Sequence, residues 1–201
     1  MKYYVTYIAL VVLLADSVIR NTFSFYVNLI LFVLIVLVMF LSEFSIFKRS
    51  FQTGQVFRSH SKRLNPFSIG LALIFTILYI ARRHEYNLIF IVLIFWSIPF
   101  IELVMQFIYK KRNPVTLVIQ EDQIIQNRPQ LNQRNLKDLV DIKYDRFNKM
   151  LKLHFKSASK ISIYTKGYQQ QDLSYLLELI VQHSEHEVTV PKNLHLVDLN
   201  R

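Results

Sequence analysis

One carboxylate inside a strongly apolar segment is the residue of this chain best suited to chemistry. Glu102 follows Pro99 by about one helical turn, with Ser97 and Gln106 near its face. A charged side chain within lipid costs about 2.5–3.5 kcal/mol on insertion scales, so such residues are functional candidates. Glu102 either lines a polar crevice for an ion, proton or substrate, or it snorkels or pairs with a basic residue of the middle loop. We favour the second interpretation, because a proton relay needs an intramembrane partner.

A second group of candidate residues is basic. Residues 48–66 (KRSFQTGQVFRSHSKRLNP) contain five basic residues and no acid, and three more follow the last apolar segment. We predict that these residues anchor the topology and contact anionic lipid headgroups, each cation adding about 1 kcal/mol near the surface. Phenylalanines of this loop would then dip into the interface, and no nucleic acid partner is predicted. The eight candidates are Lys48, Arg49, Arg58, Lys62, Arg63, Lys110, Lys111 and Arg112.

We predict structural rather than functional roles for the remaining polar residues of the apolar segments. Asp16 and Arg20 are four apart, the spacing of a local ion pair on a helix. Asn28 could hydrogen-bond to a neighbouring helix, an interaction worth about 0.6–2 kcal/mol.

No catalytic, cofactor or metal site is predicted. The chain has no cysteine and only three glycines, so thiolate sites and phosphate-cradling loops are excluded. The histidines and acids near the C-terminus are too loosely spaced for a metal site and form no HExxH motif. They are His183, His186, Glu187 and His195. A lipid-modifying enzyme using His60, His84 or Glu102 is a third and weaker hypothesis.

Four apolar stretches surround these residues. At about 1.5 Å per residue, helices of this length approach the thickness of a bilayer. They predict four transmembrane helices in two hairpins, with Pro66 starting the third helix and Pro99 kinking the fourth. The stretches are Tyr3–Ile19, Phe23–Leu41, Phe67–Ala81 and Leu88–Ile108.

The charge distribution predicts an orientation. Residues 1–112 carry 12 Lys and Arg against 4 acids, whereas residues 113–201 carry 12 against 10. Most basic residues of the first part lie at the N-terminus, in the middle loop and after the fourth stretch. The positive-inside rule therefore places both termini and the middle loop in the cytoplasm. A cleaved signal peptide over residues 1–17 is possible, but an uncleaved first helix is favoured.

After Asn113-Pro114 the pattern changes to short alternating runs. Residues 115–120 and 123–127 flank an acidic turn, and further runs follow at 139–145, 150–156 and 160–165. Period-two alternation predicts half-buried antiparallel strands, with Val140, Ile142 and Tyr144 sharing one face. Lysines of the opposite face are expected to be solvated, with a membrane-facing surface as the alternative. They are Lys143, Lys152, Lys156 and Lys160, with His154 beside them.

One amphipathic helix over residues 170–184 follows the strands. Its apolar stripe is Leu173, Leu176, Leu177, Ile180 and Val181. Residues 185–201 are predicted to be a polar tail.

Strands capped by one C-terminal helix resemble the pleckstrin-homology-like (PH-like) fold. With the preceding helices, the chain resembles bacterial membrane proteins that carry a C-terminal PH-like domain of the YcxB-like kind. The resemblance covers about residues 114–184 and rests on element order, notably the runs 117–125, 136–142 and 151–155. It implies a binding or scaffolding module. The acidic turn Glu121-Asp122 departs from phosphoinositide-binding members, whose first hairpin is basic.

The sequence therefore predicts a membrane domain over residues 1–112, a cytoplasmic PH-like α+β domain over 113–184 and a tail. We expect a non-enzymatic bacterial inner-membrane protein that binds anionic lipid and either a protein partner or a second copy. The alternative is a small transporter or channel component that uses Glu102 and the Pro99 helix break.

Overall fold

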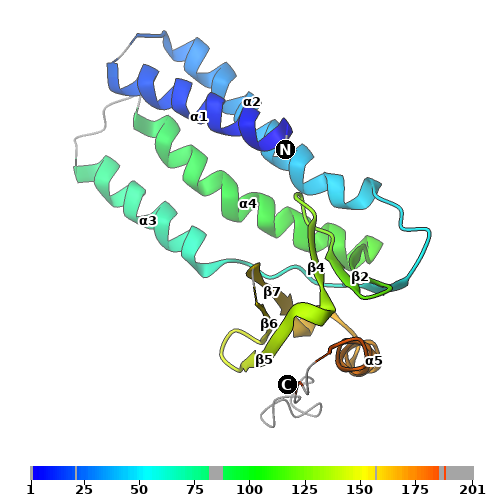
Figure 1. Ribbon diagram of the computed structural model, residues 1–201. Helices are drawn as coiled ribbons and strands as arrows, with labels where there is room; N and C mark the ends of the chain where they lie inside the picture. Colours follow the sequence, from blue (N-terminus) through cyan, green and yellow to red (C-terminus); the bar gives the residue numbers. More distant parts are fainter. Residues whose placement is uncertain (1, 21, 82–87, 157, 186–187, 189–201) are drawn as a thin grey trace. The chain divides into compact units, whose positions relative to one another are not determined.

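The chain folds into two compact units in the computed structural model (Figure 1). The helical unit comprises Met1–Ser45 and Leu64–Gln106, and the sheet unit comprises Ile46–Arg63 and Phe107–Arg201. The structure describes residues 2–20, 22–81, 88–156, 158–185 and 188. The sheet unit therefore takes in the middle loop, which the sequence analysis assigned to the membrane domain.

Four helices follow the four apolar stretches. They are α1 (Lys2–Arg20), α2 (Phe25–Phe44), α3 (Pro66–Ala81) and α4 (Ile89–Arg112), the last of which runs on into the sheet unit. Pro66 is the first residue of α3, where its missing N–H leaves no helical hydrogen bond unmade. A small apolar core joins α1, α2 and α4 through Leu14, Val18, Leu31, Ile35, Phe90 and Ile94.

The prediction of four membrane-crossing helices is met only in part. Among the described residues, two segments are long and apolar enough to cross a membrane, Phe25–Lys48 and Ile89–Arg112. The other apolar helices, Tyr7–Asp16 within α1 and α3 itself, are shorter. With 16 residues, α3 is about 24 Å long against a hydrocarbon core of about 30 Å.

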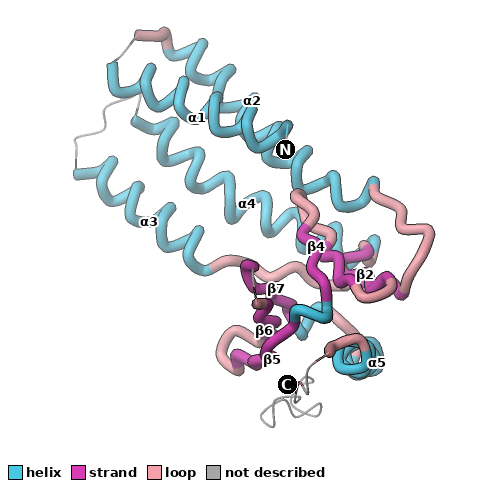
Figure 2. Tube along the Cα trace, in the orientation of Figure 1, coloured by secondary structure: helices cyan, strands magenta, loops and turns pink. Residues whose placement is uncertain are grey.

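The described residues of the sheet unit form two antiparallel sheets, helix α5 (Gln170–Gln182) and the end of α4 (Figure 2). In the first sheet the order is β1 (Gln55–Arg58), β2 (Val115–Gln120), β3 (Gln123–Gln126) and β4 (Asn132–Asn135). In the second it is β5 (Leu139–Asp145), β6 (Met150–Phe155) and β7 (Ala158–Tyr164). Helix α5 (Gln170–Gln182) follows, and three short 3-10 helices connect elements: η1 (Ser45–Lys48), η3 (Leu136–Asp138) and η4 (Thr165–Gly167). The predicted α+β class is confirmed, as are the five predicted strands and the C-terminal helix, each to within about two residues.

Strand β1 was not predicted. It comes from the basic loop and pairs antiparallel with β2, with Val56 opposite Val118 and Phe57 opposite Leu117. Phe57 is 3% exposed and belongs to the core of the sheet unit, so the prediction that this loop's phenylalanines dip into lipid is wrong for Phe57. Because β2 lies some 55 residues further on, the α3–α4 hairpin is inserted between two neighbouring strands.

The core of the sheet unit lies under α5. Leu173, Leu176, Leu177 and Ile180 are buried there as predicted, whereas Val181 is 36% exposed. Val140 is also exposed, because an irregularity between Leu139 and Asp141 changes the phase of β5 and turns Leu139 inward instead. Of the predicted tail the structure describes Glu185 and Val188, and Val188 is buried in the same core.

Candidate functional site

Glu102 belongs to α4, and its side chain contacts the start of α3. Its Oε2 accepts a hydrogen bond from the Asn65 backbone N–H at 3.0 Å, and the Ser68 hydroxyl lies 3.3 Å from the same oxygen. The Asn65 side chain accepts from the Phe67 N–H at 3.2 Å, so Asn65 caps α3 while Pro66 occupies its first turn. The N-terminus of a helix carries positive partial charge, which a carboxylate stabilises. Glu102 thus secures the beginning of α3 to α4.

The predicted polar site around Glu102 is not assembled. Ser97 is buried, and its hydroxyl donates to the Ile94 carbonyl of its own helix at 2.6 Å. Gln106 is half-buried, and no hydrogen bond among the described residues joins Glu102 to Ser97 or Gln106. Five residues at about 100° each put Ser97 and Glu102 about 140° apart around α4, which explains their separation.

Other polar residues of the helices lie within the helical unit, and the predicted bond from Asn28 to a neighbouring helix stays a prediction. Arg20 Nε lies 2.8 Å from Asp16 Oδ1, confirming the predicted ion pair. Asn28 is fully buried in α2. The Trp96 indole donates to the Thr76 hydroxyl at 2.9 Å, and the Phe75 and Phe95 rings stack 3.9 Å apart, so these pairs join α3 to α4.

Arg49 ties the basic loop to the sheet unit. Its guanidinium donates to Asn127 Oδ1 at 2.9 Å, to the Pro129 carbonyl at 2.7 Å and to the Arg128 carbonyl. Asn127 is 1% exposed and donates in turn to the Ile46 carbonyl at 3.1 Å and the Val115 carbonyl at 2.7 Å. Arg49 and Asn127 thus join the start of the loop to β2 and to the segment after β3.

The rest of the loop is held along its length. Arg58 donates to the Asn113 carbonyl at 3.2 Å, and Arg63 donates to Asn148 Oδ1 and contacts Met150 Sδ. The His60 N–H donates to the Gly167 carbonyl at 2.8 Å. A Cβ on Gly167 would lie 2.4 Å from Ser59 Oγ, so only glycine allows the two segments to approach this closely.

The structure therefore divides the predicted lipid contacts into two sets. Arg49, Arg58 and Arg63 donate hydrogen bonds to amide or carbonyl oxygens of the sheet unit, and their predicted contact with lipid stays a prediction. Lys62 is half-buried, and the side chains of the remaining predicted cations are exposed. These are Lys48, Lys110, Lys111 and Arg112.

The acidic turn between β2 and β3 forms a charged cluster with the end of α5. Asp122 Oδ2 lies 2.8 Å from Lys137 Nζ, and its Oδ1 lies 3.2 Å from His183 Nδ1. The hydrogen bond from Lys137, followed by that from His183, lowers the pKa of Asp122. The hydrogen bond to Asp122 in turn raises the pKa of Lys137. His183 thus contacts a carboxylate, and His84, His186, Glu187 and His195 lie outside the described residues.

The hairpin between β5 and β6 holds a second charged cluster. Asp145 Oδ2 accepts from Lys152 Nζ at 2.7 Å and from Asn148 Nδ2 at 2.8 Å, while Oδ1 accepts the Asn148 N–H at 3.1 Å. These bonds, led by that from Lys152, hold the pKa of the Asp145 carboxyl well below its usual range. Lys143 pairs with Asp141 at 3.1 Å, so two lysines of the predicted basic face are neutralised.

At the tip of this hairpin the Phe147 side chain is 100% exposed. The sequence analysis did not single it out, although an aromatic residue between Arg146 and Asn148 in a turn breaks the usual polar composition of turns.

Half-buried Tyr168 packs against the core of the sheet unit. Its hydroxyl lies 2.7 Å from the Thr116 hydroxyl, and burial raises the pKa of the phenol. The hydrogen bond joins the residue after η4 to β2.

Comparison with known proteins finds no matching family model, no matching curated protein and no matching solved structure. The functional argument therefore rests on the contacts of this chain alone. These contacts hold the basic loop against the sheet unit and leave the Phe147 side chain fully exposed.

Proposed function

We propose that the protein is a non-enzymatic integral membrane protein of the bacterial inner membrane. In this proposal α1–α4 lie in the bilayer and the sheet unit is a cytoplasmic PH-like module that binds a protein partner. The proposal draws support from the outward-facing apolar side chains of all four helices, including the two short ones. Val12 on α1 is 61% exposed and Ile77 on α3 is 65% exposed, a cost in water that lipid would remove.

The insertion of α3–α4 between β1 and β2 carries the argument for a scaffold. The chain passes between helices and sheet three times, from α2 into η1, from β1 into α3, and from α4 into β2. The last connection is only Asn113 and Pro114 long. A partner bound to this module would be held close to the membrane by three connections rather than by one flexible linker.

The PH-like part of the proposal rests on element order. The six strands from β2 to β7, antiparallel to their neighbours in the two sheets, are followed by α5, whose apolar face is buried. The acidic turn at Glu121-Asp122 disfavours phosphoinositide as the ligand, so a protein or peptide remains the ligand class we propose. A partner could equally be a second copy of the chain.

The transporter alternative draws no support from the contacts of its key residues. The carboxylate of Glu102 accepts a hydrogen bond from the start of α3, and α4 remains helical through Pro99. We therefore assign Glu102 to helix positioning. A Glu102→Gln protein that lost ion flux in reconstituted vesicles, while keeping its melting temperature, would revive the transporter alternative.

Cysteine accessibility tests the proposed membrane topology. The chain contains no cysteine, so single cysteines need no background mutations. Thr22→Cys, between α1 and α2, should react with an impermeant maleimide from the periplasm. Gln52→Cys, in the exposed part of the basic loop, should react only after permeabilisation. The reverse pattern, or release of the protein by carbonate, would refute the proposal.

Proximity labelling from the full chain tests the binding role. The matched control is Phe57→Ala, which removes a core side chain of the sheet unit and leaves α1–α4 unchanged. We expect a defined set of labelled neighbours that is lost in the control at equal membrane abundance. Identical labelling in the two proteins would show that the sheet unit recruits no partner.

A further inference from the structure

We propose that the outer edge of β1 binds an extended peptide as an added antiparallel strand, and that this peptide carries acidic residues at its N-terminal end. The edge consists of Val56 and Arg58, and the added strand would lengthen the first sheet by one member. This inference rests on the proposed function, because it names the kind of partner that the sheet unit binds. All of the residues that carry it belong to the sheet unit.

The backbone of Val56 is directed away from β2. The Asn127 N–H donates to the Thr116 carbonyl at 2.9 Å, which makes these two residues a hydrogen-bonded pair of β3 and β2. Such pairs alternate along an antiparallel strand, so Leu117, next to Thr116, bonds instead to its β1 partner Phe57. Val56 precedes Phe57, and its N–H and C=O therefore point outward. Among the described residues no hydrogen bond occupies either group, and β1 is the first strand of its sheet.

Val56 also offers an apolar side chain to an added strand. It is 42% exposed and lies in a cross-strand row with Val118 and Ile125. This row is on the face of the first sheet that alternates with the core residues Leu117 and Ile124. A β-branched residue placed opposite Val56 would extend the row and remove apolar surface from water.

The charges at the C-terminal end of β1 are positive. Arg58 is exposed, and its guanidinium donates to the Asn113 carbonyl at 3.2 Å, a neutral acceptor that does not cancel its charge. Lys110 and Lys111 are exposed and precede Asn113 by three and two residues. Within the described part of the chain no carboxylate forms an ion pair with any of these three cations. A peptide carboxylate at this end would therefore complement their charge.

The charge at the other end of β1 has the opposite sign. Gln55 pairs with Ile119, which lies two residues before Glu121 in the acidic turn, and Glu121 is exposed. An antiparallel added strand begins beside Arg58 and ends on the side of Glu121. The charges therefore favour a peptide with acidic residues first and basic residues last, and they disfavour the reverse order.

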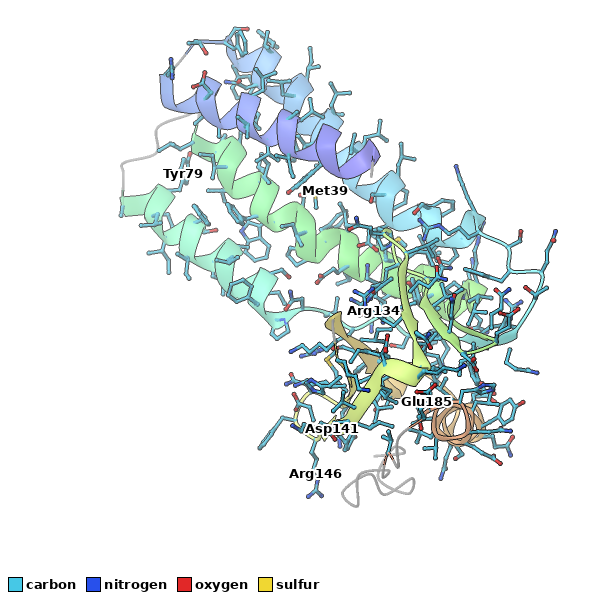
Figure 3. The ribbon with its side chains drawn as sticks, viewed as in Figure 1. Met39, Tyr79, Arg134, Asp141, Arg146 and Glu185 are labelled. Carbon is cyan, nitrogen blue, oxygen red and sulfur yellow. The ribbon has the colours of Figure 1, made fainter. Side chains whose placement is uncertain are left out.

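The opposite edge of the first sheet, β4, is protected by a side chain. The Leu136 N–H donates to the Asp122 carbonyl at 2.6 Å, so the same alternation directs the Gln133 backbone outward. The guanidinium of Arg134, labelled in Figure 3, donates to the Gln133 carbonyl at 2.7 Å. Charged residues on an edge strand guard it against strand addition. No side chain of the described residues covers the Val56 carbonyl in this way, which is why we assign the peptide to β1.

Val56→Pro tests the edge while keeping the pairing of β1 with β2. Proline removes only an N–H that points outward, and edge strands tolerate proline at such positions. Val56→Thr is the matched control, since it keeps both backbone groups and the β-branched shape. The probe is a fluorescent peptide of alternating valine and threonine with two glutamates at its N-terminus and two lysines at its C-terminus. A second peptide exchanges the glutamates and lysines, so that its composition and net charge are the same.

Fluorescence anisotropy with the full chain in neutral detergent micelles would measure both peptides. We expect the acid-first peptide to bind wild type and Val56→Thr about fivefold more tightly than the base-first peptide, or better. Val56→Pro should weaken the binding of the acid-first peptide by a similar factor at an unchanged melting temperature. Equal affinities of the two peptides would overturn the inference, and so would binding that Val56→Pro leaves unchanged.

A second variant keeps the test decisive if Val56→Pro lowers the melting temperature. Arg58→Gln with Lys110→Gln changes exposed side chains only and should remove the preference for the acid-first peptide. A preference that survives this double substitution would refute the role of the cations. Adding phosphatidylglycerol to the micelles tests lipid as the alternative ligand. Binding of phosphatidylglycerol that displaces the peptide equally from wild type and Val56→Pro would assign the surface to lipid and overturn the inference.

Proximity labelling separates this inference from the proposed function. Neighbours that are lost in Phe57→Ala but kept in Val56→Pro would leave the scaffold proposal standing and refute the β1 edge as its binding site. Identical labelling in wild type, Phe57→Ala and Val56→Pro would refute the scaffold proposal itself.

Discussion

The helical unit and the sheet unit place similar side chains in opposite environments. On α3, Ile74, Ile77 and Ile80 are 53–65% exposed while Ser68 and Ala72 are buried. In the sheet unit Ile161 and Ile163 are at most 1% exposed. Isoleucine is equally apolar in both, so this difference in exposure is what the proposed location of the helices in lipid predicts. Substitutions at matched positions in the two units test this contrast.

The largest expected effect is at Phe57, the core residue that β1 contributes. Phe57→Ala should lower the free energy of unfolding of the sheet unit by about 3–5 kcal/mol, because a buried ring is lost and a cavity remains. Phe100→Ala is the matched control, since Phe100 is 66% exposed on α4 and should cost little in detergent. Urea denaturation in micelles would measure both. Equal losses would erase the contrast between the units.

The two glycines Gly167 and Gly70 give a second matched pair. Gly167→Ala should destabilise the sheet unit by about 1–3 kcal/mol, since the new methyl group would overlap Ser59 and force the loop away. Around a Cβ on Gly70, in α3, no atom of the described residues lies within 4 Å. Gly70→Ala should therefore be neutral or stabilising by up to about 1 kcal/mol, from helix propensity. Thermal unfolding of the two variants would expose any reversal of this order.

Glu102 offers a smaller effect within the helical unit. Glu102→Ala removes the acceptor of the Asn65 N–H and should cost about 0.5–2 kcal/mol, as the loss of a helix cap does. Glu102→Gln keeps an acceptor oxygen and should retain part of that stability. Limited proteolysis would measure this effect, since release of the start of α3 should speed cleavage between residues 59 and 68 in Glu102→Ala. Equal sensitivity in wild type and Glu102→Ala would contradict this role.

Asp145 predicts a pH dependence confined to the sheet unit. Its pKa is lowered in the folded state, so its contribution to stability is present above the unfolded pKa of about 3.9 and is lost as the pH falls below it. Asp145→Asn should therefore reduce the melting temperature at pH 7 and make it less sensitive to pH between about 4 and 2. Melting curves across that range would check this, and parallel curves for variant and wild type would contradict it.

The sequence could predict the elements that follow a regular period. Four apolar helices, five alternating strands and one amphipathic helix were all visible, because burial on one face imposes a period of 3.6 or 2. Strand β4, Asn132–Asn135, was missed because an edge strand made only of polar residues has no apolar alternation. Strand β1 was missed because it holds four residues, and its partner lies beyond two helices.

The candidate site was less predictable for a related reason. Basic residues next to apolar segments suit lipid headgroups and protein carbonyls equally, and composition cannot distinguish the two. Arg49 finds its acceptors at Asn127, Arg128 and Pro129 only because β1 brings the loop to β2. Long-range pairing of this kind leaves no local pattern. Glu102 likewise needed the start of α3 beside it before its role was visible.

The most direct test of the account is a disulfide between β1 and β2 in native membranes. Val56→Cys with Val118→Cys places two cysteines at directly opposed positions in a chain that has no others. The account predicts rapid cross-linking on mild oxidation, with little for Val56→Cys paired with Val140→Cys of the other sheet. In the opposite outcome the first pair fails to form a disulfide, while a fluorophore attached to Val56→Cys is quenched by nitroxide lipids. That result would mean that the loop lies on the bilayer and would contradict the account.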